Sequence, residues 1–299
     1  MNSPNSDIKL VGVMGAGQMG LGIAQTAATA GFNVMLQDIS ADALIVAVSR
    51  IEQSIDKLIE KGKLGADVRN GTLGRISTSR APEDFKNADL VIEAVSEDPS
   101  LKFDLFIKLD RICKEGAILA SNTSSISITE IAAKTKRAEN VIGLHFMNPV
   151  PVMKLVEVIR GLKTSQSTFL SVKAFSECLG KVCVESKDYS GFIVNRILMP
   201  MINEAIYALF EGLASIEDID NAMKLGTNQP MGPLTLADFI GLDTCLSIMK
   251  VLHEGLGDSK YRPCPLLKQY VSAGMLGRKT GQGFYKYEVQ KPSKLSLTV

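Results

Sequence analysis

The sequence predicts an α/β protein with a doubly wound sheet in its N-terminal part and an all-helical C-terminal part. Three observations lead to this prediction. A glycine-rich turn, GAGQMG, joins an apolar segment to a helical one close to the N-terminus. Apolar and helical segments then alternate as far as residue 186, as they do in doubly wound folds. From Ser190 onward the pattern is helical throughout, so we expect domains at residues 1–187 and 188–299.

The first expected strand, residues 8–14, is apolar and rich in β-branched side chains, as are strands that helices cover on both faces. Gly15 then makes a tight turn, Gly17 lets the backbone approach a phosphate, and Gly20 lets the following helix pack closely. That helix, expected at residues 21–30, points its free N–H groups and the positive end of its dipole at the same place. The segment therefore predicts a Rossmann-type site for the pyrophosphate of a dinucleotide.

Asp38 follows directly after the second expected strand, residues 33–37. Its separation from Gly20 is about the same as that of the acidic residue in the dinucleotide-binding fingerprint. In that fingerprint the carboxylate accepts hydrogen bonds from the adenosine ribose. Its negative charge would repel a 2′-phosphate, so the sequence favours NAD over NADP. A glycine-rich turn in some other α/β fold is the alternative interpretation.

The remaining elements of the N-terminal domain follow from apolar runs and helical periodicity. The expected strands are residues 89–95, 117–121, 141–146, 154–159 and 181–186. A long helix is expected at 40–61, followed by a polar, glycine-rich turn region at 62–74. Right-handed crossovers between the strands give the doubly wound sheet.

The C-terminal domain begins with a long helical pattern, GFIVNRILMPMINEAIYALFEGL. Its expected apolar stripe includes Val194, Leu198, Met201, Ala205 and Leu209. Three later stretches are helical too: IEDIDNAMKLG, TLADFIGLDTCLSIMKVLHEGL and CPLLKQYVSAG. The large apolar share of this domain suggests that it also forms a subunit interface.

Composition argues against several classes of function. The 299 residues are 45% hydrophobic and 22% charged, as in ordinary globular proteins, and they carry a net charge of +1. Such a charge gives no general attraction to nucleic acid or membrane surfaces. Five scattered cysteines without a CxxC pair, and only two histidines, lead us to expect neither disulfides nor a metal site.

The two ends of the sequence carry no active targeting signal that we recognise. The segment MNSPNSD lacks the apolar or arginine-rich character of a signal or transit peptide. No run of about 18 apolar residues predicts a membrane span. Residues 293–295 spell a peroxisomal signal, SKL, but that signal is read only at a C-terminus. We therefore expect a soluble, cytoplasmic protein, with the peroxisomal matrix as the alternative if the native chain ended at Leu295.

A nicotinamide-dependent reaction needs a group that moves a proton, and histidine suits this because it titrates near neutral pH. His145 lies at the carboxyl end of an expected parallel strand, where doubly wound sheets bind their ligands. Glu157 lies within the next apolar strand, and a buried glutamate needs a partner. We expect Glu157 to fix the tautomer of His145 and to stabilise its imidazolium form. A core histidine and an exposed strand glutamate are the alternatives.

Other polar residues occur where an active site would need them. The segment SNTSS, residues 121–125, follows a strand and could orient a substrate oxygen, whereas Ser124 or Ser125 could instead cap the next helix. Asn148 comes soon after the strand that carries the histidine. Asn195 lies in an apolar helix of the second domain, where it could close the site or merely bridge two helices.

The ordered motifs of this chain resemble those of the L-3-hydroxyacyl-CoA dehydrogenases, especially the short 3-hydroxybutyryl-CoA type. The resemblance extends from Ile8 to about Tyr287. It rests on GAGQMGLGIAQ, DLVIEAVSED, ASNTSS, GLHFMNPVPVMKLVEVIRG, SGFIVNR, DNAMKLG, MGPLTLADFIGLD and GRKTGQGFYKY.

The resemblance implies that His145 is the catalytic base and Glu157 its orienting partner. It also implies that Ser124 and Asn195 hold the substrate oxygen and the histidine in register. The cofactor-binding residues that it implies are Gly15, Ala16, Gly17, Gln18, Met19, Gly20, Asp38, Glu97, Lys102, Ser124, Asn148 and Lys279. For coenzyme A it implies Ser54 and Lys61, which lie on a basic helix that could otherwise be a solvated face.

The implied activity is the reversible, NAD-dependent oxidation of an (S)-3-hydroxyacyl-CoA to the 3-ketoacyl-CoA in fatty-acid metabolism. A four-carbon chain and a homodimer are expected. One alternative is a dehydrogenase of a free hydroxy or sugar acid, as in the gulonate-dehydrogenase and lambda-crystallin group. Another is a non-enzymatic NAD-binding protein. The basic helix argues against the first alternative, and the intact pair of His145 and Glu157 argues against the second.

Overall fold

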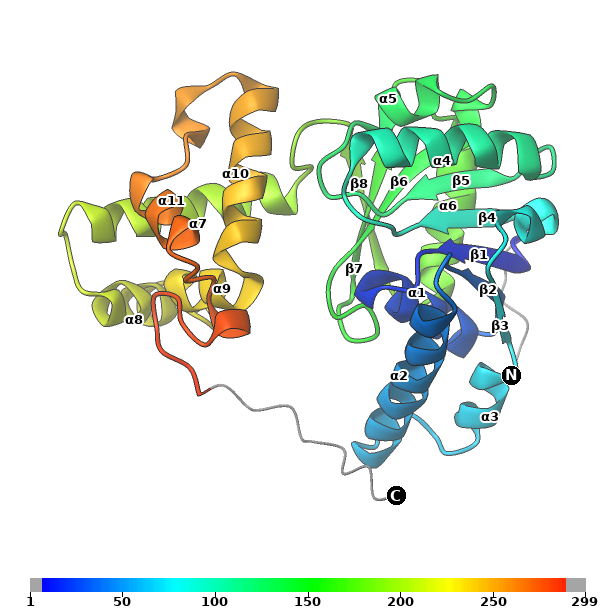
Figure 1. Ribbon diagram of the computed structural model, residues 1–299, viewed down its shortest axis with the longest axis horizontal. Coiled ribbons are helices and arrows are strands. Elements are labelled where there is room, and N and C mark those ends of the chain that lie inside the picture. The colour runs from blue at the N-terminus through cyan, green and yellow to red at the C-terminus, as the bar shows by residue number, and fades with distance from the viewer. Residues whose placement is uncertain (1–6, 289–299) are drawn as a thin grey trace. The chain divides into compact units, whose positions relative to one another are not determined.

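The computed structural model describes residues 7–288 of the chain. The contacts divide the chain into two compact units, Met1–Phe192 and Ile193–Val299 (Figure 1). The junction lies a few residues beyond residue 187, because the turn after the last strand packs Phe192 into the core of the first unit. The sequence SKL at 293–295 lies outside the described residues.

The first unit is built on one eight-stranded sheet with the order β3-β2-β1-β4-β5-β6-β7-β8. The strands are β1 Leu10–Met14, β2 Asn33–Gln37, β3 Ile76–Ser79, β4 Leu90–Glu93, β5 Ile118–Ser121, β6 Val141–Phe146, β7 Leu155–Arg160 and β8 Val182–Lys187. All neighbours are parallel except β6 and β7. The arrangement confirms the expected Rossmann-type sheet.

Two details of this sheet were not anticipated from sequence. The edge strand β3, with the sequence ISTS, is short and mostly polar, so it carries little of the apolar signal that marked the other strands. The strands β6 and β7 are antiparallel, because the segment 147–154 between them is too short for the crossover that a parallel pair requires. In this register His145 lies directly opposite Glu157.

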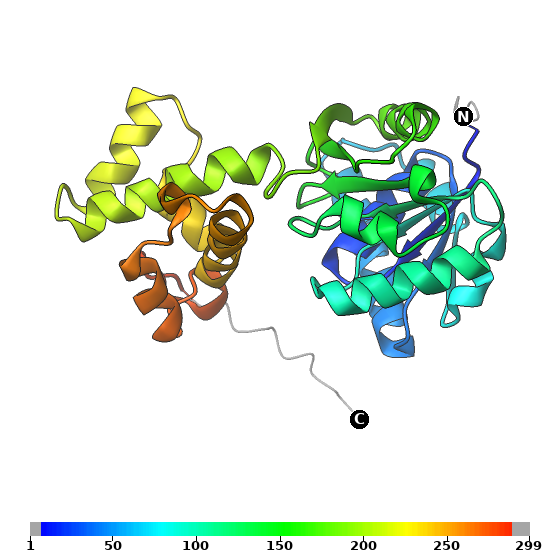
Figure 2. The same ribbon diagram turned by 90° about the horizontal axis from the view of Figure 1, so that it is seen from above.

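Helices cover both faces of the sheet (Figures 1 and 2). They are α1 Gln18–Thr29, α2 Ala41–Glu60, α3 Val68–Leu73, α4 Pro99–Ile112, α5 Ile128–Ala133 and α6 Gln166–Cys178. Successive residues of β4 show the layering: Leu90 and Ile92 pack with α1, α2 and α6, whereas Val91 packs with α4 and α5. The helix α3 forms inside the region that was expected to be a turn.

The second unit is helical, as expected. Its helices are α7 Val194–Phe210, α8 Ile216–Gly226, α9 Pro233–Ile240, α10 Leu242–Leu256 and α11 Pro265–Ser272. Four members of the expected apolar stripe of α7 lie on the core: Ala205 is buried, and Leu198, Met201 and Leu209 are partly buried against it. The fully buried residues Met199, Ile202 and Ile206 were not in the expected stripe. Because α7 is apolar around most of its circumference, periodicity alone did not single out the buried face.

Two buried carboxylates hold the closing segment of the second unit. Asp238 accepts hydrogen bonds from the backbone N–H groups of Phe284 and Tyr285, both at 2.9 Å. Asp220 accepts one from the hydroxyl of Tyr285 at 3.0 Å. These contacts tie the segment after α11 to α8 and α9.

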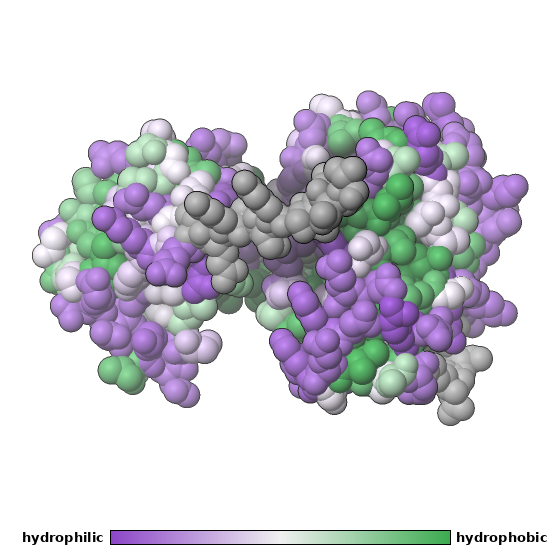
Figure 3. All heavy atoms as spheres, turned by 60° about the horizontal axis from the view of Figure 1, so that its bottom comes forward, coloured by the Kyte–Doolittle hydropathy of each residue, from purple (hydrophilic) through white to green (hydrophobic). Residues whose placement is uncertain are grey.

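The surface of each unit mixes polar and apolar side chains, as the face in Figure 3 shows. Between residues 7 and 288, none of the helices combines the length and hydropathy needed to span a bilayer.

Candidate active site

The glycine-rich turn between β1 and α1 is closely packed at two glycines and open at the third. Gly15 has a φ of +100°, and a Cβ atom there would lie 2.7 Å from the carbonyl oxygen of Ala94. A Cβ atom on Gly20 would lie 1.8 Å from the carbonyl oxygen of Gly15. At Gly17, the N-cap residue of α1, a Cβ atom would meet nothing within 4 Å. The turn therefore leaves the N–H groups at the start of α1 approachable by a phosphate.

Asp38 connects the end of β2 to this turn. One carboxylate oxygen accepts a hydrogen bond from the backbone N–H of Ala16, and the other accepts one from Ser40, both at 2.9 Å. The carboxylate thus lies beside the turn at the carboxyl edge of the sheet, the position that binds ribose hydroxyls in dinucleotide folds. The turn, the helix and the acidic residue fit a dinucleotide, and the negative charge of Asp38 fits NAD.

His145 and Glu157 form a buried pair on the neighbouring strands β6 and β7. Nδ1 of His145 lies 2.8 Å from Oε2 of Glu157, and the two residues are 8% and 0% exposed. Opposite residues of an antiparallel pair point to the same side of the sheet, so the register itself brings the two side chains together. With the proton on Nδ1, the ring donates a hydrogen bond to the carboxylate, which leaves Nε2 as the nitrogen that can take or give a proton.

An aromatic residue that the sequence did not single out lies against this histidine. The ring centroids of Phe192 and His145 are 5.7 Å apart, with an angle of 60° between the planes. Phe192 is 4% exposed and has a φ of +50°, a conformation that a bulky residue rarely adopts. Gly191 before it also has a positive φ, of 77°. Strained backbone of this kind occurs where the surrounding structure requires it, often at functional sites.

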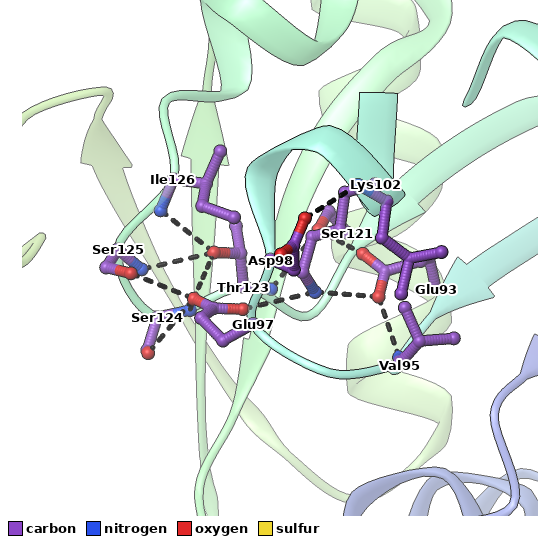
Figure 4. Close-up of polar contacts among 11 residues, drawn as sticks. Glu93, Val95, Glu97, Asp98, Lys102, Ser121, Thr123, Ser124, Ser125 and Ile126 are labelled. Atoms are coloured by element: carbon purple, nitrogen blue, oxygen red, sulfur yellow. Dashed lines mark hydrogen bonds and ion pairs between the residues drawn. The ribbon is translucent and has the colours of Figure 1, made fainter. Parts of the chain in front are cut away.

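The carboxylate of Glu97 accepts hydrogen bonds from the residues that follow β5 (Figure 4). Its Oε1 accepts hydrogen bonds from the hydroxyl of Thr123 at 2.5 Å, the N–H of Ser124 at 2.9 Å and the hydroxyl of Ser125 at 2.9 Å. Burial acts to raise the pKa of Glu97, but the positive charge of Lys102 and these hydrogen bonds outweigh it, so the pKa is lowered. Ser124 is thereby held in place by an ionised carboxylate.

Behind Glu97 lies a buried ion pair, also shown in Figure 4. Nζ of Lys102 lies 2.7 Å from Oε1 of Glu93 and 3.1 Å from Oε2 of Glu97. Glu93 also accepts hydrogen bonds from the hydroxyl of Ser121 and the N–H of Val95, both at 2.7 Å. Lys102 is 1% exposed and Glu93 is fully buried, so the ammonium group is enclosed between two carboxylates.

Glu93 was missed at the sequence level, although a signal was present. It ends the apolar strand LVIE, just as Glu157 interrupts the apolar strand LVEVIR. The argument that a buried glutamate needs a partner applies equally to both residues.

The structure places the other sequence-predicted residues as follows. The side chain of Gln18 donates to that of Asn148 at 3.1 Å, which joins the start of α1 to the segment after β6. Ser54 lies on α2, and Lys61 is its C-cap residue. Asn195 is buried in α7 of the second unit.

Lys279 also belongs to the second unit, where its Nζ lies 2.5 Å from Oδ1 of Asp243. Burial acts to raise the pKa of Asp243, but the hydrogen bond and positive charge of Lys279, together with hydrogen bonds from backbone N–H groups such as that of Thr244, outweigh it, and the pKa is lowered. Over the described range, no three His, Cys, Asp or Glu side chains are grouped as metal ligands would be.

Two family models together match nearly the whole chain. The NAD-binding domain of 3-hydroxyacyl-CoA dehydrogenase matches residues 10–189, and the C-terminal domain of 3-hydroxyacyl-CoA dehydrogenase matches residues 191–287. The first model confirms NAD as the expected cofactor of the first unit.

Individual relatives are similar over the same span. The chain is 56% identical to the 3-hydroxybutyryl-CoA dehydrogenase of Bradyrhizobium diazoefficiens, over 95% of this chain and 97% of that protein. It is 47% identical to the mitochondrial hydroxyacyl-coenzyme A dehydrogenase of Homo sapiens, over 94% of this chain and 92% of that protein. The crystal structure of (S)-3-hydroxybutyryl-CoA dehydrogenase from Ralstonia eutropha matches with a TM-score of 0.92 and 53% identity, covering 94% of this chain and 99% of that one. The chain therefore belongs to the 3-hydroxyacyl-CoA dehydrogenase family.

Proposed function

We propose that this protein catalyses the reversible oxidation of an (S)-3-hydroxyacyl-CoA to the 3-ketoacyl-CoA with NAD. The buried pair of His145 and Glu157, at the carboxyl edge of an NAD-binding sheet, is the observation that carries this proposal. Bound NAD⁺ supplies a hydride acceptor. Nε2 of His145 takes the hydroxyl proton, and Glu157 stabilises the imidazolium that results. In the opposite direction the same imidazolium returns the proton to the 3-oxygen.

The residues around this pair have distinct roles in the proposal. Ser124, fixed by Glu97, holds the 3-oxygen of the substrate. Gln18 and Asn148 contribute to the cofactor site. The roles that the resemblance implies for Asn195 and Lys279 stay predictions. Lys102 is enclosed by two carboxylates, and we assign it the task of orienting Glu97.

The substrate is proposed to be a short-chain thioester, 3-hydroxybutyryl-CoA. The relatives named as 3-hydroxybutyryl-CoA dehydrogenases support this choice. Ser54 and Lys61 are proposed to contact coenzyme A, whose phosphates a lysine can bind. The alternative, a dehydrogenase of the same fold that acts on a free hydroxy or sugar acid, is disfavoured. Such a substrate has no coenzyme A phosphates for the basic end of α2 to bind.

We also propose a homodimer and a cytoplasmic location. Exposed apolar side chains in the second unit, such as Ile197 and Phe239, support a homodimer formed through that unit. The bacterial relatives support a cytoplasmic role in fatty-acid oxidation.

The experiment that tests the proposal follows NADH absorbance during reduction of acetoacetyl-CoA. Parallel reactions contain free acetoacetate in place of the thioester, or NADPH in place of NADH. We expect rapid oxidation of NADH with the thioester, little with the free acid, and weak use of NADPH because its 2′-phosphate would meet Asp38. Equal rates with free acetoacetate would favour the hydroxy-acid alternative. If the protein bound NADH but turned over neither substrate, the proposal that it is a dehydrogenase would be contradicted.

A further inference from the structure

The end of β6 that carries His145 extends beyond the neighbouring strand β5. The residue pairs of the parallel ladder between these two strands end with Ser121 and Gly143. His145 and Phe146 lie past that point, where their strand partner is β7 on the other side. A contact from the β5 side therefore has to come from a residue that follows the end of β5.

The side chain of Asn122, the first residue after β5, supplies that contact. Its Oδ1 accepts a hydrogen bond from the backbone N–H of Phe146 at 2.9 Å. Phe146 is 1% exposed, so this N–H has little access to water, and a buried N–H without an acceptor is costly. The amide oxygen of Asn122 thus takes the place of the next backbone carbonyl in the ladder and holds the end of β6.

The backbone of Asn122 is anchored to the buried carboxylates described above. Its N–H donates to the carbonyl oxygen of Glu93 at 2.8 Å. The residues on either side donate their hydroxyl groups to carboxylates, Ser121 to Glu93 at 2.7 Å and Thr123 to Glu97 at 2.5 Å. Because the backbone is held on both sides, the position of the Asn122 side chain is well defined, and the strand end bonded to it is placed accordingly.

The same segment carries Ser124, two residues beyond Asn122. The carboxylate of Glu97 accepts the N–H of Ser124 at 2.9 Å, so this serine is fixed to the same network. Asn122 therefore connects two parts of the candidate active site. One is the segment that presents Ser124, and the other is the strand that presents His145.

We propose that Asn122 is a positioning residue for proton transfer. Through its hydrogen bond to the N–H of Phe146, it sets the position of His145 relative to Ser124. The inference rests on the proposed function, because it takes His145 as the group that moves the proton. A displacement of about 1 Å in a catalytic group can lower a rate roughly 100-fold, so one contact at a strand end can have a large effect on kcat.

The opposite end of β6 has a similar contact, which provides a matched control. The hydroxyl of Thr164 donates to the carbonyl oxygen of Val141, the first residue of the strand, at 2.6 Å. Thr164 is 6% exposed. The substitution Thr164→Val therefore removes a buried side-chain hydrogen bond to the same strand, at the end away from His145.

The test compares Asn122→Leu with Thr164→Val in the full chain. Leucine keeps the approximate shape of asparagine and removes the acceptor. In the protein without substrate or cofactor, we expect the amide hydrogen of Phe146 to exchange with deuterium roughly tenfold faster in Asn122→Leu. The imidazole NMR signals of His145 should move in the same variant. The kcat for acetoacetyl-CoA reduction should fall roughly tenfold to 100-fold, whereas the Kd of NADH should be unchanged.

Thr164→Val should leave the exchange of Phe146, the signals of His145 and kcat as in the wild type. A lower kcat in Asn122→Leu with unchanged His145 signals would assign the amide to direct contact with a ligand and overturn the proposal. Faster exchange of Phe146 with an unchanged kcat, or equal effects of the two substitutions on kcat, would overturn it as well.

Asn122→Ser is a second variant in case the leucine variant does not fold. Its side chain is shorter, so its oxygen lies further from the N–H of Phe146, and the same changes are expected. The exchange and the histidine signals are measured without turnover. Failure of the proposed reaction would therefore be seen separately, in the assay of the wild type with acetoacetyl-CoA.

Discussion

In the proposed reaction, the contact between Nδ1 of His145 and Glu157 leaves Nε2 as the nitrogen that transfers the proton. A histidine whose Nδ1 donates to a carboxylate presents Nε2 to the substrate, and its cationic form is stabilised by the neighbouring negative charge. The pair is buried, so water competes little for either partner.

Replacing His145 by glutamine should leave cofactor binding intact and remove the proton transfer. We expect kcat for acetoacetyl-CoA reduction to fall at least about 100-fold, the usual contribution of general acid–base catalysis. The Kd of NADH, measured by titration, should be unchanged. The variant His253→Gln, which alters the other histidine, should keep wild-type turnover. Turnover of His145→Gln close to that of the wild type would remove this residue from the mechanism.

Phe192 is expected to position the catalytic imidazole. Its ring packs against His145, and an aromatic contact of this kind is worth about 0.5–1.5 kcal/mol beyond the area it buries. We expect Phe192→Leu to lower kcat by roughly threefold to tenfold without changing the KM for NADH. Phe192→Tyr, which keeps the ring, should restore much of the loss.

The histidine resonances give a second measurement for Phe192. The chain has only two histidines, so the imidazole signals in an NMR spectrum are readily assigned with the His253→Gln variant. Loss of the aromatic ring should move the signals of His145 and leave those of His253 in place. Unchanged His145 signals together with unchanged kcat would contradict the positioning role.

Among the secondary-structure elements, β4, β5 and α4 are joined by the buried carboxylate of Glu93. It binds Lys102 of α4 and Ser121 of β5, and Lys102 in turn contacts Glu97. Through this chain of contacts the start of α4 is linked to the segment that carries Ser124. Three elements therefore contribute to the placement of Ser124, which we propose binds the substrate oxygen.

Glu93→Gln should destabilise the first unit strongly. Removing one charge of a buried ion pair typically costs about 3–5 kcal/mol. We expect the lower end of that range here, because Glu97, whose Oε2 lies 3.1 Å from Nζ of Lys102, still pairs with the ammonium group. The free energy of unfolding from a urea titration would measure this loss. Asp258→Asn, which removes a carboxylate from an exposed ion pair with Lys260, should leave the transition unchanged. Equal effects of the two substitutions would show that burial of Glu93 has no energetic consequence.

Periodicity and motif spacing predicted most of these elements but not all. The apolar strands and the glycine-rich turn were found because helices cover both faces of the sheet, which makes the strands uniformly apolar. The edge strand β3 and the helix α3 were missed because they are short and mostly polar.

The pairing of His145 with Glu157 could be anticipated from the cost of burying a glutamate. The contact of Phe192 with His145 could not, because it depends on a positive φ, which sequence gives little reason to expect for phenylalanine.

On the scale of the whole molecule, the two units have separate cores and different optical properties. The chain contains no tryptophan and six tyrosines. Tyr189 lies in the first unit, and the others, residues 207, 261, 270, 285 and 287, lie in the second. Tyrosine fluorescence therefore reports mainly on the second unit, whereas NADH binding reports on the first.

This difference allows a pH prediction for the second unit. Burial raises the pKa of Asp238 above its ordinary value of 3.8, although backbone hydrogen bonds from Tyr285 and Phe284 oppose the shift. As pH rises from 3.8 towards the raised pKa, the unfolded chain loses its proton first, so the contribution of this group to stability falls. We expect the unfolding midpoint seen by tyrosine fluorescence to decrease over that range.

The variant Asp238→Asn should lack this decrease, because the amide does not titrate. The slope of stability against pH is the quantity to compare, since the substitution also changes the hydrogen bonds to Phe284 and Tyr285. Asp243 and Asp258 have lowered pKa values, so their contributions are lost at lower pH, below 3.8. Parallel slopes for wild type and variant would contradict the role of Asp238.

Because His145 and Glu157 lie on paired strands, their placement is set by β6 and β7 and not by the tip of the segment between them. His145 and Glu157 face each other because of the antiparallel strand pairing, and β7 is held in place by its parallel pairing with β8 as well as by the short segment that joins it to β6. Insertions or exchanges among residues 151–153 should therefore leave the pair in place, whereas a single deletion inside either strand would turn one partner to the opposite side of the sheet. Directed evolution of this protein towards bulkier substrates can accordingly randomise that tip while keeping both strands constant.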